Sequence, residues 1–270
     1  MEKVSMGTVT LQGAALYYET RGEGQPVVLI HAGVADRRMW NAQWETLSAG
    51  FQLIRFDLRG YGLSTPPDGP FTYYDDVRGL LDHLGVAQAH IAGVSFGGRT
   101  ALDFALVYPE RVRSLVLGAP SIGGQPDSPE TDAFAEQEEA LLEAGDLDAA
   151  SQLNVDFWVV GAGRAPERVD PAMRQAVFEM QRAAFGVALP SGFAPSGLTP
   201  PAIDRLREIH VPALVLIGDA DTPGVQALAR KAAAEIPGAR LFVRPDVGHM
   251  VTMERPHEID TLLRDFLHPA

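Results

Sequence analysis

The chain has 270 residues, 46% hydrophobic and 21% charged, which is enough for one large domain or two smaller ones with a sizeable core. It has no cysteine, so disulfides, thiolate metal sites and cysteine nucleophiles are excluded. The formal net charge of −13 argues against nucleic acid and anionic membrane surfaces as partners. No apolar stretch approaches the ~20 residues of a membrane span, and the first residues lack a signal-peptide pattern, so we expect a cytoplasmic protein.

Strand and helix signals alternate along the first 120 residues. Strands are predicted at two segments within 4–20 and at 27–30, 51–56, 89–94 and 112–117. Helices are predicted between them at 40–48, 74–84 and 96–108. This alternation predicts an α/β fold with a mostly parallel sheet and helices on both faces. In such sheets functional side chains collect at the carboxyl ends of the strands.

The alternation is interrupted between residues 121 and 200, where helical signals occur without a convincing strand. Two N-cap residues followed by proline, Ser128-Pro129 and Asp170-Pro171, mark helix starts there. We expect 121–200 to be an inserted helical cap, and 1–120 together with 201–270 to form the core. Further elements of the core are predicted as strands at 213–217 and 240–243 and helices at 225–236 and 257–267.

One serine stands where a predicted strand turns directly into a predicted helix. Ser95 follows the strand at 89–94, and Gly93 and Gly97 flank it, giving G-x-S-x-G. Such a sharp turn forces the serine into a strained conformation and requires neighbours without Cβ atoms, so that strand and helix can approach. The hydroxyl is expected at the tip of the turn, above a helix N-terminus that favours developing negative charge.

A serine hydroxyl needs an adjacent base, and the base needs a partner that fixes its tautomer. His249 lies in a glycine-preceded loop after the strand at 240–243, and Asp221 follows the strand at 213–217. Both therefore stand at carboxyl ends of strands. The chain order serine, acid, histidine is the order that accompanies a strand-turn-helix nucleophile.

Several further motifs occur in order along the chain. They are LIHAG at 29–33, FDLRGYGLS at 56–64, GVSFGG at 93–98, YPERVRSLVL at 108–117, VPALVLIGDAD at 211–221 and DVGHMVTMERP at 246–256. With these motifs the chain resembles the α/β-hydrolase fold superfamily over 9–120 and 201–270, in particular its capped serine esterases and lactonases. The resemblance implies a mostly parallel central sheet with helices on both faces and an inserted all-helical cap.

The resemblance also implies roles for individual residues. Ser95 would be the nucleophile, His249 the general base and then acid, and Asp221 the carboxylate that orients the histidine. The oxyanion hole would consist of the backbone N–H groups of Phe96 and Gly33. Fixed donors of this kind act where negative charge develops in the transition state.

The loop after the strand at 27–30 departs from the superfamily in one residue. The superfamily usually has His-Gly where this chain has His31-Ala32-Gly33. Because alanine reaches fewer backbone conformations than glycine, the resemblance places the second oxyanion donor at Gly33 only to within one residue. His31 would support this loop rather than transfer protons.

Other acidic and basic residues near the motifs have alternative interpretations. Asp219 is the alternative to Asp221 as the acid of the triad. Asp246 is expected to shape the turn that precedes the histidine loop. Asp57 and Arg59 are expected to tie neighbouring loops together rather than take part in catalysis.

The substrate pocket is the least determined part of this interpretation. Its candidate lining residues are Val34, Trp40, Phe157, Trp158, Phe178 and Met250. The aromatic residues of the cap can equally pack the cap onto the core. We expect no cofactor and no metal: the glycine-rich stretch at 161–166 lacks the third glycine and the context of a dinucleotide loop, and no metal-ligand spacing such as H-E-x-x-H occurs.

The resemblance implies a cofactor-free serine hydrolase that cleaves small to medium-sized esters or lactones through an acyl-enzyme on Ser95. Hydrolysis of a C–C bond in dicarbonyl ring-cleavage products would use the same triad, and perhydrolysis is a further alternative. Outside catalysis, the alternative is a slow-turnover ligand sensor of the same fold. The expected partner is a small-molecule ester or lactone, with no nucleic acid and no membrane, and the oligomeric state stays open.

Overall fold

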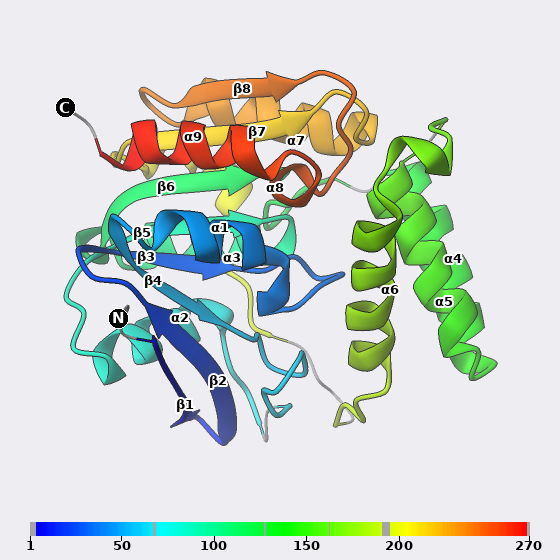
Figure 1. Cartoon of the computed structure of the whole chain (residues 1–270), viewed down its shortest axis with the longest axis horizontal. Coiled ribbons are helices and arrows are strands. Elements are labelled where there is room, and N and C mark those ends of the chain that lie inside the picture. The colour runs from blue at the N-terminus through cyan, green and yellow to red at the C-terminus, as the bar shows by residue number, and fades with distance from the viewer. Residues whose placement is uncertain (1–3, 67–68, 127, 162, 191–194, 269–270) are drawn as a thin grey trace.

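The computed structural model describes residues 4–66, 69–126, 128–161, 163–190 and 195–268. Within these residues the centre is an eight-stranded sheet with the order β1-β2-β4-β3-β5-β6-β7-β8 (Figure 1). The strands are β1 (Val4–Leu11), β2 (Ala14–Arg21), β3 (Gln25–Ile30), β4 (Phe51–Phe56), β5 (Ala89–Val94), β6 (Val112–Gly118), β7 (Ala213–Gly218) and β8 (Arg240–Arg244). The β1–β2 and β2–β4 pairs are antiparallel and the others are parallel, which confirms the predicted mostly parallel sheet.

Helices cover both faces of this sheet (Figure 1). One face carries α1 (Asn41–Leu47) and α9 (Pro256–Leu267), which follows the single turn α8 (Val251–Glu254). The other face carries α2 (Tyr73–His83), α3 (Phe96–Val107) and α7 (Pro223–Glu235). None of the helices in the described ranges is both long and apolar enough to cross a membrane.

Alternate side chains of the central strands enter two separate cores. In β3, Val27 and Leu29 belong to the core beneath α1 and α9, whereas Val28 and Ile30 belong to the core beneath α2, α3 and α7. All four are fully buried. A strand covered on both faces has no side chain that faces water, which explains why the sequence shows a continuous apolar run here.

The order of the strands along the sheet reverses next to β3. The next strand in the chain, β4, lies on one side of β3, and β5 lies on the other. The helix after β3 (α1) and the helix after β5 (α3) cover opposite faces, so the loops that leave these two strands diverge. Divergent loops leave a crevice at the carboxyl ends of the strands, where open parallel sheets bind their ligands. The loops concerned begin at His31 and Ser95.

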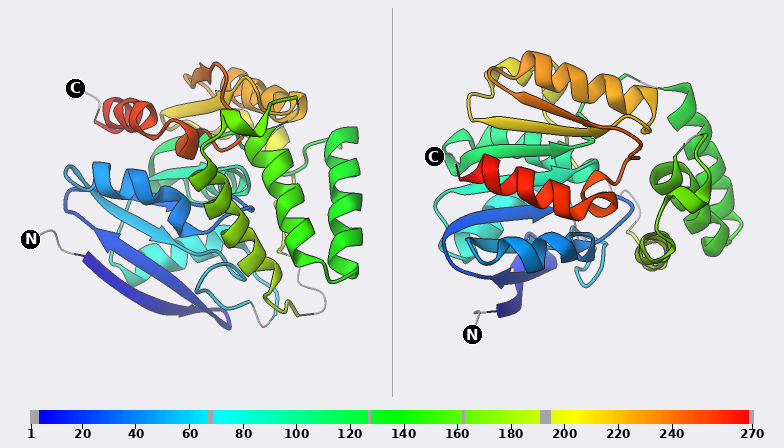
Figure 2. Two further views of the ribbon diagram at one scale, coloured as in Figure 1. Left: turned by 45° about the vertical axis from the view of Figure 1, so that its right-hand side comes forward. Right: turned by 45° about the horizontal axis from the view of Figure 1, so that its top comes forward.

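Three helices stand beside the carboxyl ends of the strands, apart from the two helical faces (Figures 1 and 2). They are α4 (Pro129–Glu143), α5 (Leu147–Asn154) and α6 (Pro171–Phe185), together called the helical layer α4–α6, and a π-helical segment (Val155–Val160) continues α5. The described part of 121–200 contains helices and no strand, as the sequence predicts. Val159 and Val177 join the core beneath α1 and α9, so this layer and the sheet share a core.

Candidate active site

Ser95 occupies a strained turn between β5 and α3. Its backbone has φ 54° and ψ −116°, a conformation that non-glycine residues rarely adopt. A Cβ on Gly93 would lie 2.1 Å from the Gly97 carbonyl oxygen, and a Cβ on Gly97 would lie 2.4 Å from the carbonyl oxygen of Ile30. Both flanking positions therefore admit only glycine. The Ser95 N–H donates to the carbonyl oxygen of Gly118 at 2.8 Å, which ties the turn to the end of β6.

His249 and Asp221 form a buried hydrogen-bonded pair across two loops. Nδ1 of His249 donates to Oδ2 of Asp221 at 2.7 Å, and both side chains are almost fully buried. The other carboxylate oxygen accepts the Thr222 N–H at 2.7 Å, which fixes the plane of the carboxylate. A proton on Nδ1 leaves Nε2 as the hydrogen-bond acceptor of the ring.

The loop of His249 lies directly on the end of β7. A Cβ on Gly218 would lie 2.0 Å from the carbonyl oxygen of Val247, so only glycine allows this contact. The Ala220 N–H donates to the same carbonyl at 3.0 Å, which joins the loop after β7 to the loop after β8. These contacts bring the two side chains within bonding distance although they are 28 positions apart in the chain.

The Ser95 turn and the His249 loop meet at the end of β6. Gly118 accepts the Ser95 N–H, and a Cβ on Gly118 would lie 3.6 Å from Cγ1 of Val251, just beyond His249. Among the described residues no hydrogen bond joins Ser95 Oγ to His249 Nε2. Catalytic hydrogen bonds are often long or poorly aligned before substrate binds and tighten in the complex.

The two N–H groups expected to form an oxyanion hole lie on neighbouring backbones. A Cβ on Gly33 would lie 3.5 Å from the Cβ of Phe96, so the loop after β3 packs against the first turn of α3. Neither N–H has a hydrogen-bond partner within the described part of the chain, and the same is true of Val34. Unpaired N–H donors at this place can bind a developing oxyanion. Because the N–H groups of Gly33 and Val34 are both unpaired, either of them can be the second donor beside Phe96.

His31 is fully buried beneath the loop that carries Gly33. Its Nε2 accepts the Leu58 N–H at 2.9 Å, and its Nδ1 donates to the carbonyl oxygen of Ala32 at 2.8 Å. Burial lowers the pKa of His31, so the ring is neutral at neutral pH. Because backbone groups occupy both nitrogens, the ring supports the loop and has no free nitrogen for proton transfer.

The alternative acid, Asp219, bonds away from the histidine ring. Its Oδ1 accepts the Asp246 N–H at 2.7 Å. Asp246 itself has φ 56°, the left-handed conformation that aspartate tolerates in tight turns. The carboxylate that reaches His249 is therefore that of Asp221, and the Asp219–Asp246 contact closes the turn before the loop.

Asp57 and Arg59 hold loops together. The Asp57 carboxylate accepts from the Arg37 guanidinium at 2.7 Å and from the Leu63 N–H at 2.8 Å. Arg59 makes a fully buried ion pair with Asp76 of α2 at 2.5 Å. Among the described residues neither side chain bonds to Ser95, Asp221 or His249, so both hold loops together as expected.

The predicted pocket residues occupy four different places. Trp158 lies on the His249 ring, with ring centroids 4.7 Å apart and ring planes inclined by 43°. Phe157 packs against Phe134 of α4, with centroids 4.6 Å apart. Phe178 lines a cavity of about 290 Å³ between α5 and α6. The other three are buried in the core that the helical layer shares with the sheet: Val34, Trp40 and Met250.

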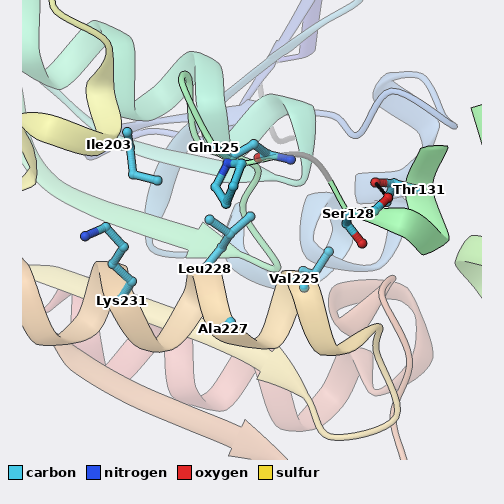
Figure 3. A pocket seen from close by; sticks show the side chains of 10 residues that line it. Gln125, Ser128, Thr131, Ile203, Val225, Ala227, Leu228 and Lys231 are labelled. Carbon is cyan, nitrogen blue, oxygen red and sulfur yellow. Dashed lines mark hydrogen bonds between the residues drawn. The ribbon is translucent and has the colours of Figure 1, made fainter.

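A separate cavity of about 220 Å³ lies between α7 and the segment that leads into α4 (Figure 3). Val225 and Leu228 of α7 line one wall, and Gln125 and Ser128 line the opposite wall. None of the predicted site residues contributes to it. Elsewhere in the described ranges, no group of three or more His, Cys, Asp or Glu side chains is arranged to hold a metal ion.

Polar side chains that the sequence did not single out lie near the loop that carries Gly33. The Tyr61 ring packs edge-on against His31, and its hydroxyl oxygen would lie 3.8 Å from a Cβ on Gly33. Burial, with a smaller contribution from the Glu138 carboxylate, raises the pKa of Tyr61 to about 12, so the hydroxyl is neutral. Burial also raises the pKa of Glu138, whose Oε1 accepts from Asn154 Nδ2 at 2.5 Å. Tyr61 belongs to the FDLRGYGLS motif at 56–64, whereas Glu138 lies on α4 and Asn154 on α5, outside the motifs quoted above.

The fold and the placement of these side chains correspond to one family. The model of the alpha/beta hydrolase family matches residues 27–261, and the chain belongs to this family. The similar proteins carry the names of several different activities.

Two curated relatives span almost the whole chain. BpoC of Mycobacterium tuberculosis, provisionally named a non-heme bromoperoxidase, is 30% identical over 264 residues, covering 93% of this chain and 97% of BpoC. The 3-oxoadipate enol-lactonase 2 of Acinetobacter baylyi is 28% identical over 273 residues, covering 96% and 97%. Among solved structures, a thermophilic esterase from Thermogutta terrifontis superposes with a TM-score of 0.79 at 28% identity, covering 97% of this chain and 98% of that chain.

Proposed function

We propose that this protein is a serine hydrolase that cleaves small to medium-sized carboxylic esters or lactones through an acyl-enzyme on Ser95. The observation that carries the proposal is the buried 2.7 Å hydrogen bond between His249 and Asp221, at the edge of the sheet where the strained Ser95 turn also lies. That bond selects the tautomer in which Nε2 can accept a proton. The likeness to a lactonase and an esterase supports this substrate class.

In the first half-reaction Ser95 Oγ attacks the acyl carbon while its proton passes to His249 Nε2. The N–H groups of Gly33 and Phe96 bind the carbonyl oxygen as it becomes an anion. His249 then gives the proton to the leaving alcohol oxygen, the C–O bond breaks, and the acyl group remains on Ser95 as an ester. Asp221 stabilises the imidazolium that exists between the two proton transfers.

In the second half-reaction water replaces the alcohol. His249 Nε2 accepts a proton from this water, and the water oxygen attacks the acyl carbon. When the second tetrahedral intermediate collapses, His249 returns the proton to Ser95 Oγ and the carboxylic acid leaves. With a lactone, the alcohol stays tethered to the acyl group, so the final product is one hydroxy acid.

We propose that residues 121–200 form a cap over a core made of 1–120 and 201–270. The position of the helical layer α4–α6 beside the carboxyl ends of the strands supports this division (Figure 2). The contact of Trp158 with the His249 ring supports a role of the cap in lining the pocket. A cap that shares the core of the sheet excludes bulk water from the reacting groups and limits the size of the substrate.

Activity profiling with covalent labelling tests the proposal. We expect steady hydrolysis of p-nitrophenyl acetate or of a panel of lactones, and a single fluorophosphonate adduct that mass spectrometry locates on Ser95. Ser95→Ala should abolish both, and Asp221→Asn should lower kcat about 10⁴-fold.

Turnover of a dicarbonyl ring-cleavage product alone would favour C–C hydrolysis, and a persistent adduct after one turnover would favour a sensor. Near wild-type ester hydrolysis by Ser95→Ala would refute the mechanism.

A further inference from the structure

The chain that follows α5 reaches both loops of the His249–Asp221 pair. We call this stretch the 155–164 segment; it comprises the π-helical residues and the glycine-rich stretch as far as Arg164, and residue 162 lies outside the described part. Its Trp158 lies on the His249 ring. A Cβ on Gly161 would lie 3.0 Å from the carbonyl oxygen of Ala220, directly before the acid of the pair. One segment of the helical region therefore contacts the base on one side and the loop of its acid on the other.

Arg164 connects this segment to the backbone of the His249 loop through a buried ion pair. Its Nη2 lies 2.5 Å from Oε1 of Glu254 and its Nη1 lies 3.3 Å from Oε2, with side-chain exposures of 8% and 3%. Nη2 also donates to the carbonyl oxygen of Asp246 at 3.3 Å, and Nη1 donates to that of Val160 at 3.2 Å. The guanidinium thus holds its own segment, α8 and the base loop at one point.

Glu254 carries this contact to the residue next to the base. Its Oε2 accepts the Gly248 N–H at 2.9 Å. A Cβ on Gly248 would lie 2.8 Å from Nη1 of Arg164 and 3.2 Å from the carbonyl oxygen of Val159, so glycine is required for this close approach. The peptide that leads into His249 is therefore fixed by a carboxylate and a guanidinium that belong to different parts of the chain.

We propose that Arg164 and Glu254 are positioning residues for His249, so that the base reaches its working geometry only when the 155–164 segment is docked on the sheet. This inference rests on the proposed function and adds a dependence of the triad on the helical region. Removing an ion pair partner from a buried site leaves the other charge uncompensated, and the loop must move to solvate it. Displacement of a reacting group by about 1 Å can cost ~10²-fold in rate.

The charged groups around His249 determine in which direction each substitution should shift the pH profile. Asp221 bonds to the ring, Glu254 and Arg164 flank the preceding peptide, and the more distant Asp219 and Asp246 belong to the turn before it. Arg168 pairs with Asp246 on the exposed side of that turn. Losing the cation of Arg164 favours protonation of the base, whereas losing the anion of Glu254 disfavours it. The two substitutions should therefore move the acid limb of the pH profile in opposite directions.

The first experiment measures kcat and KM for p-nitrophenyl acetate across pH. Arg164→Gln and Glu254→Gln should each lower kcat about 10- to 100-fold with little change in KM. The half-maximal point of the acid limb should move to higher pH in Arg164→Gln and to lower pH in Glu254→Gln. Gly248→Ala, which alters no charge, should lower kcat without moving the limb in either direction.

A matched control uses an ion pair to the same turn. Arg168→Gln removes the exposed partner of Asp246 and should leave kcat, KM and the pH profile at wild-type values, because exposed pairs contribute little. Thermal unfolding of every variant, followed by circular dichroism, shows whether it is folded. If a single variant does not fold, the double variant Arg164→Gln/Glu254→Gln, which leaves no buried charge unpaired, takes its place and should retain the loss in kcat.

Nuclear magnetic resonance of the His249 ring supplies a readout that needs no turnover. The ring signals, assigned by their absence in His249→Ala, should titrate with the same opposite displacements in Arg164→Gln and Glu254→Gln. Displaced signals in a protein without Ser95-dependent hydrolysis would support the positioning and refute the proposed function. Wild-type kcat, pH profile and ring titration in both folded variants would overturn the positioning while leaving the hydrolase proposal in place.

Discussion

Ser95 and His249 stand at the same edge of the sheet but are held there in different ways. The Ser95 turn is fixed by its immediate neighbours, since Cβ atoms on Gly93 or Gly97 would meet backbone carbonyls at 2.1 and 2.4 Å. The His249 loop is fixed by groups from distant parts of the chain, among them Trp158 and the Arg164–Glu254 pair, whose members are 90 positions apart. Backbone sterics alone hold the first region, whereas side chains from the helical region add to the backbone contact of Val247 with Gly218 in the second.

The Ser95 turn therefore depends on nearby backbone alone, whereas the His249 loop also depends on contacts with the helical region. The Ser95 turn forms wherever β5 and α3 form, because its contacts are between backbone atoms of these elements and the end of β3. The His249 loop is held by backbone contacts with the end of β7 and also by side-chain contacts that reach it from the 155–164 segment. Substitutions in the two regions should therefore affect folding and activity in different proportions, which the following predictions test.

The largest effect is expected where the two regions must act together. Ser95→Ala and His249→Ala should each lower kcat about 10⁵–10⁶-fold, and the double variant should be no slower than either single variant, because the residues act as one unit. Burst-corrected steady-state kinetics on p-nitrophenyl acetate measures this. Additive losses in the double variant would mean that the two side chains act in separate steps.

A smaller effect distinguishes the regions by stability. Gly93→Ala should lower the free energy of unfolding by at least about 3 kcal/mol or prevent folding, because the new Cβ meets backbone that cannot move. Gly248→Ala should lower it by about 1–2 kcal/mol, because its nearest contact is the end of the Arg164 side chain. Urea unfolding followed by circular dichroism compares the two. Equal losses would remove the distinction between a backbone-determined and a side-chain-determined region.

The last effect concerns a carboxyl group on α3, the helix that follows Ser95. Burial raises the pKa of Asp103 to about 6, and its Oδ1 has no hydrogen-bond partner among the residues that the structure describes. Because the folded pKa lies above the unfolded value, this group lowers stability as the pH rises from about 4 to 6. Asp103→Asn should therefore stabilise the protein by about 1–3 kcal/mol at pH 8 and by almost nothing at pH 4.

Urea unfolding of Asp103→Asn at pH 4 and pH 8 checks this prediction. The pH dependence of kcat/KM for the same variant then compares it with the variants of the His249 loop. A charge change on α3 should leave the acid limb of kcat/KM where it is, in contrast to charge changes at Arg164 and Glu254. An equal stability gain at pH 4 and pH 8 would contradict the assignment to ionisation of this carboxyl group.

Much of the fold was predictable because it follows from local patterns. Apolar runs gave the buried strands, and the alternation of strands and helices gave the parallel sheet. The places of Ser95, Asp221 and His249 at carboxyl ends of strands followed from the same pattern. Choosing Asp221 over Asp219 needed either the resemblance or the structure, since both follow β7 and only the coordinates show which carboxylate bonds to the ring.

Other features had no sequence signal that separates function from packing. Trp158 and Phe157 are adjacent aromatic residues that both pack against Phe134, and only the structure shows that the Trp158 ring also lies on His249. Phe178 shares their helical region and lines a cavity between α5 and α6. Aromatic character alone predicts burial, whereas the direction of a side chain depends on the helix rotation that tertiary packing selects.

By itself, the sequence determined the sheet, the glycine-flanked serine turn and the order of the candidate triad, because sterics and hydrophobic periodicity act between near neighbours in the chain. Only the tertiary structure decided that Arg164 meets Glu254 behind Gly248 and that the helical region thereby contacts the His249 loop. The partner of a buried charge can come from any position along the chain, because desolvation and geometry in the folded state select it. The spacing of neighbouring residues in the sequence does not determine either of these.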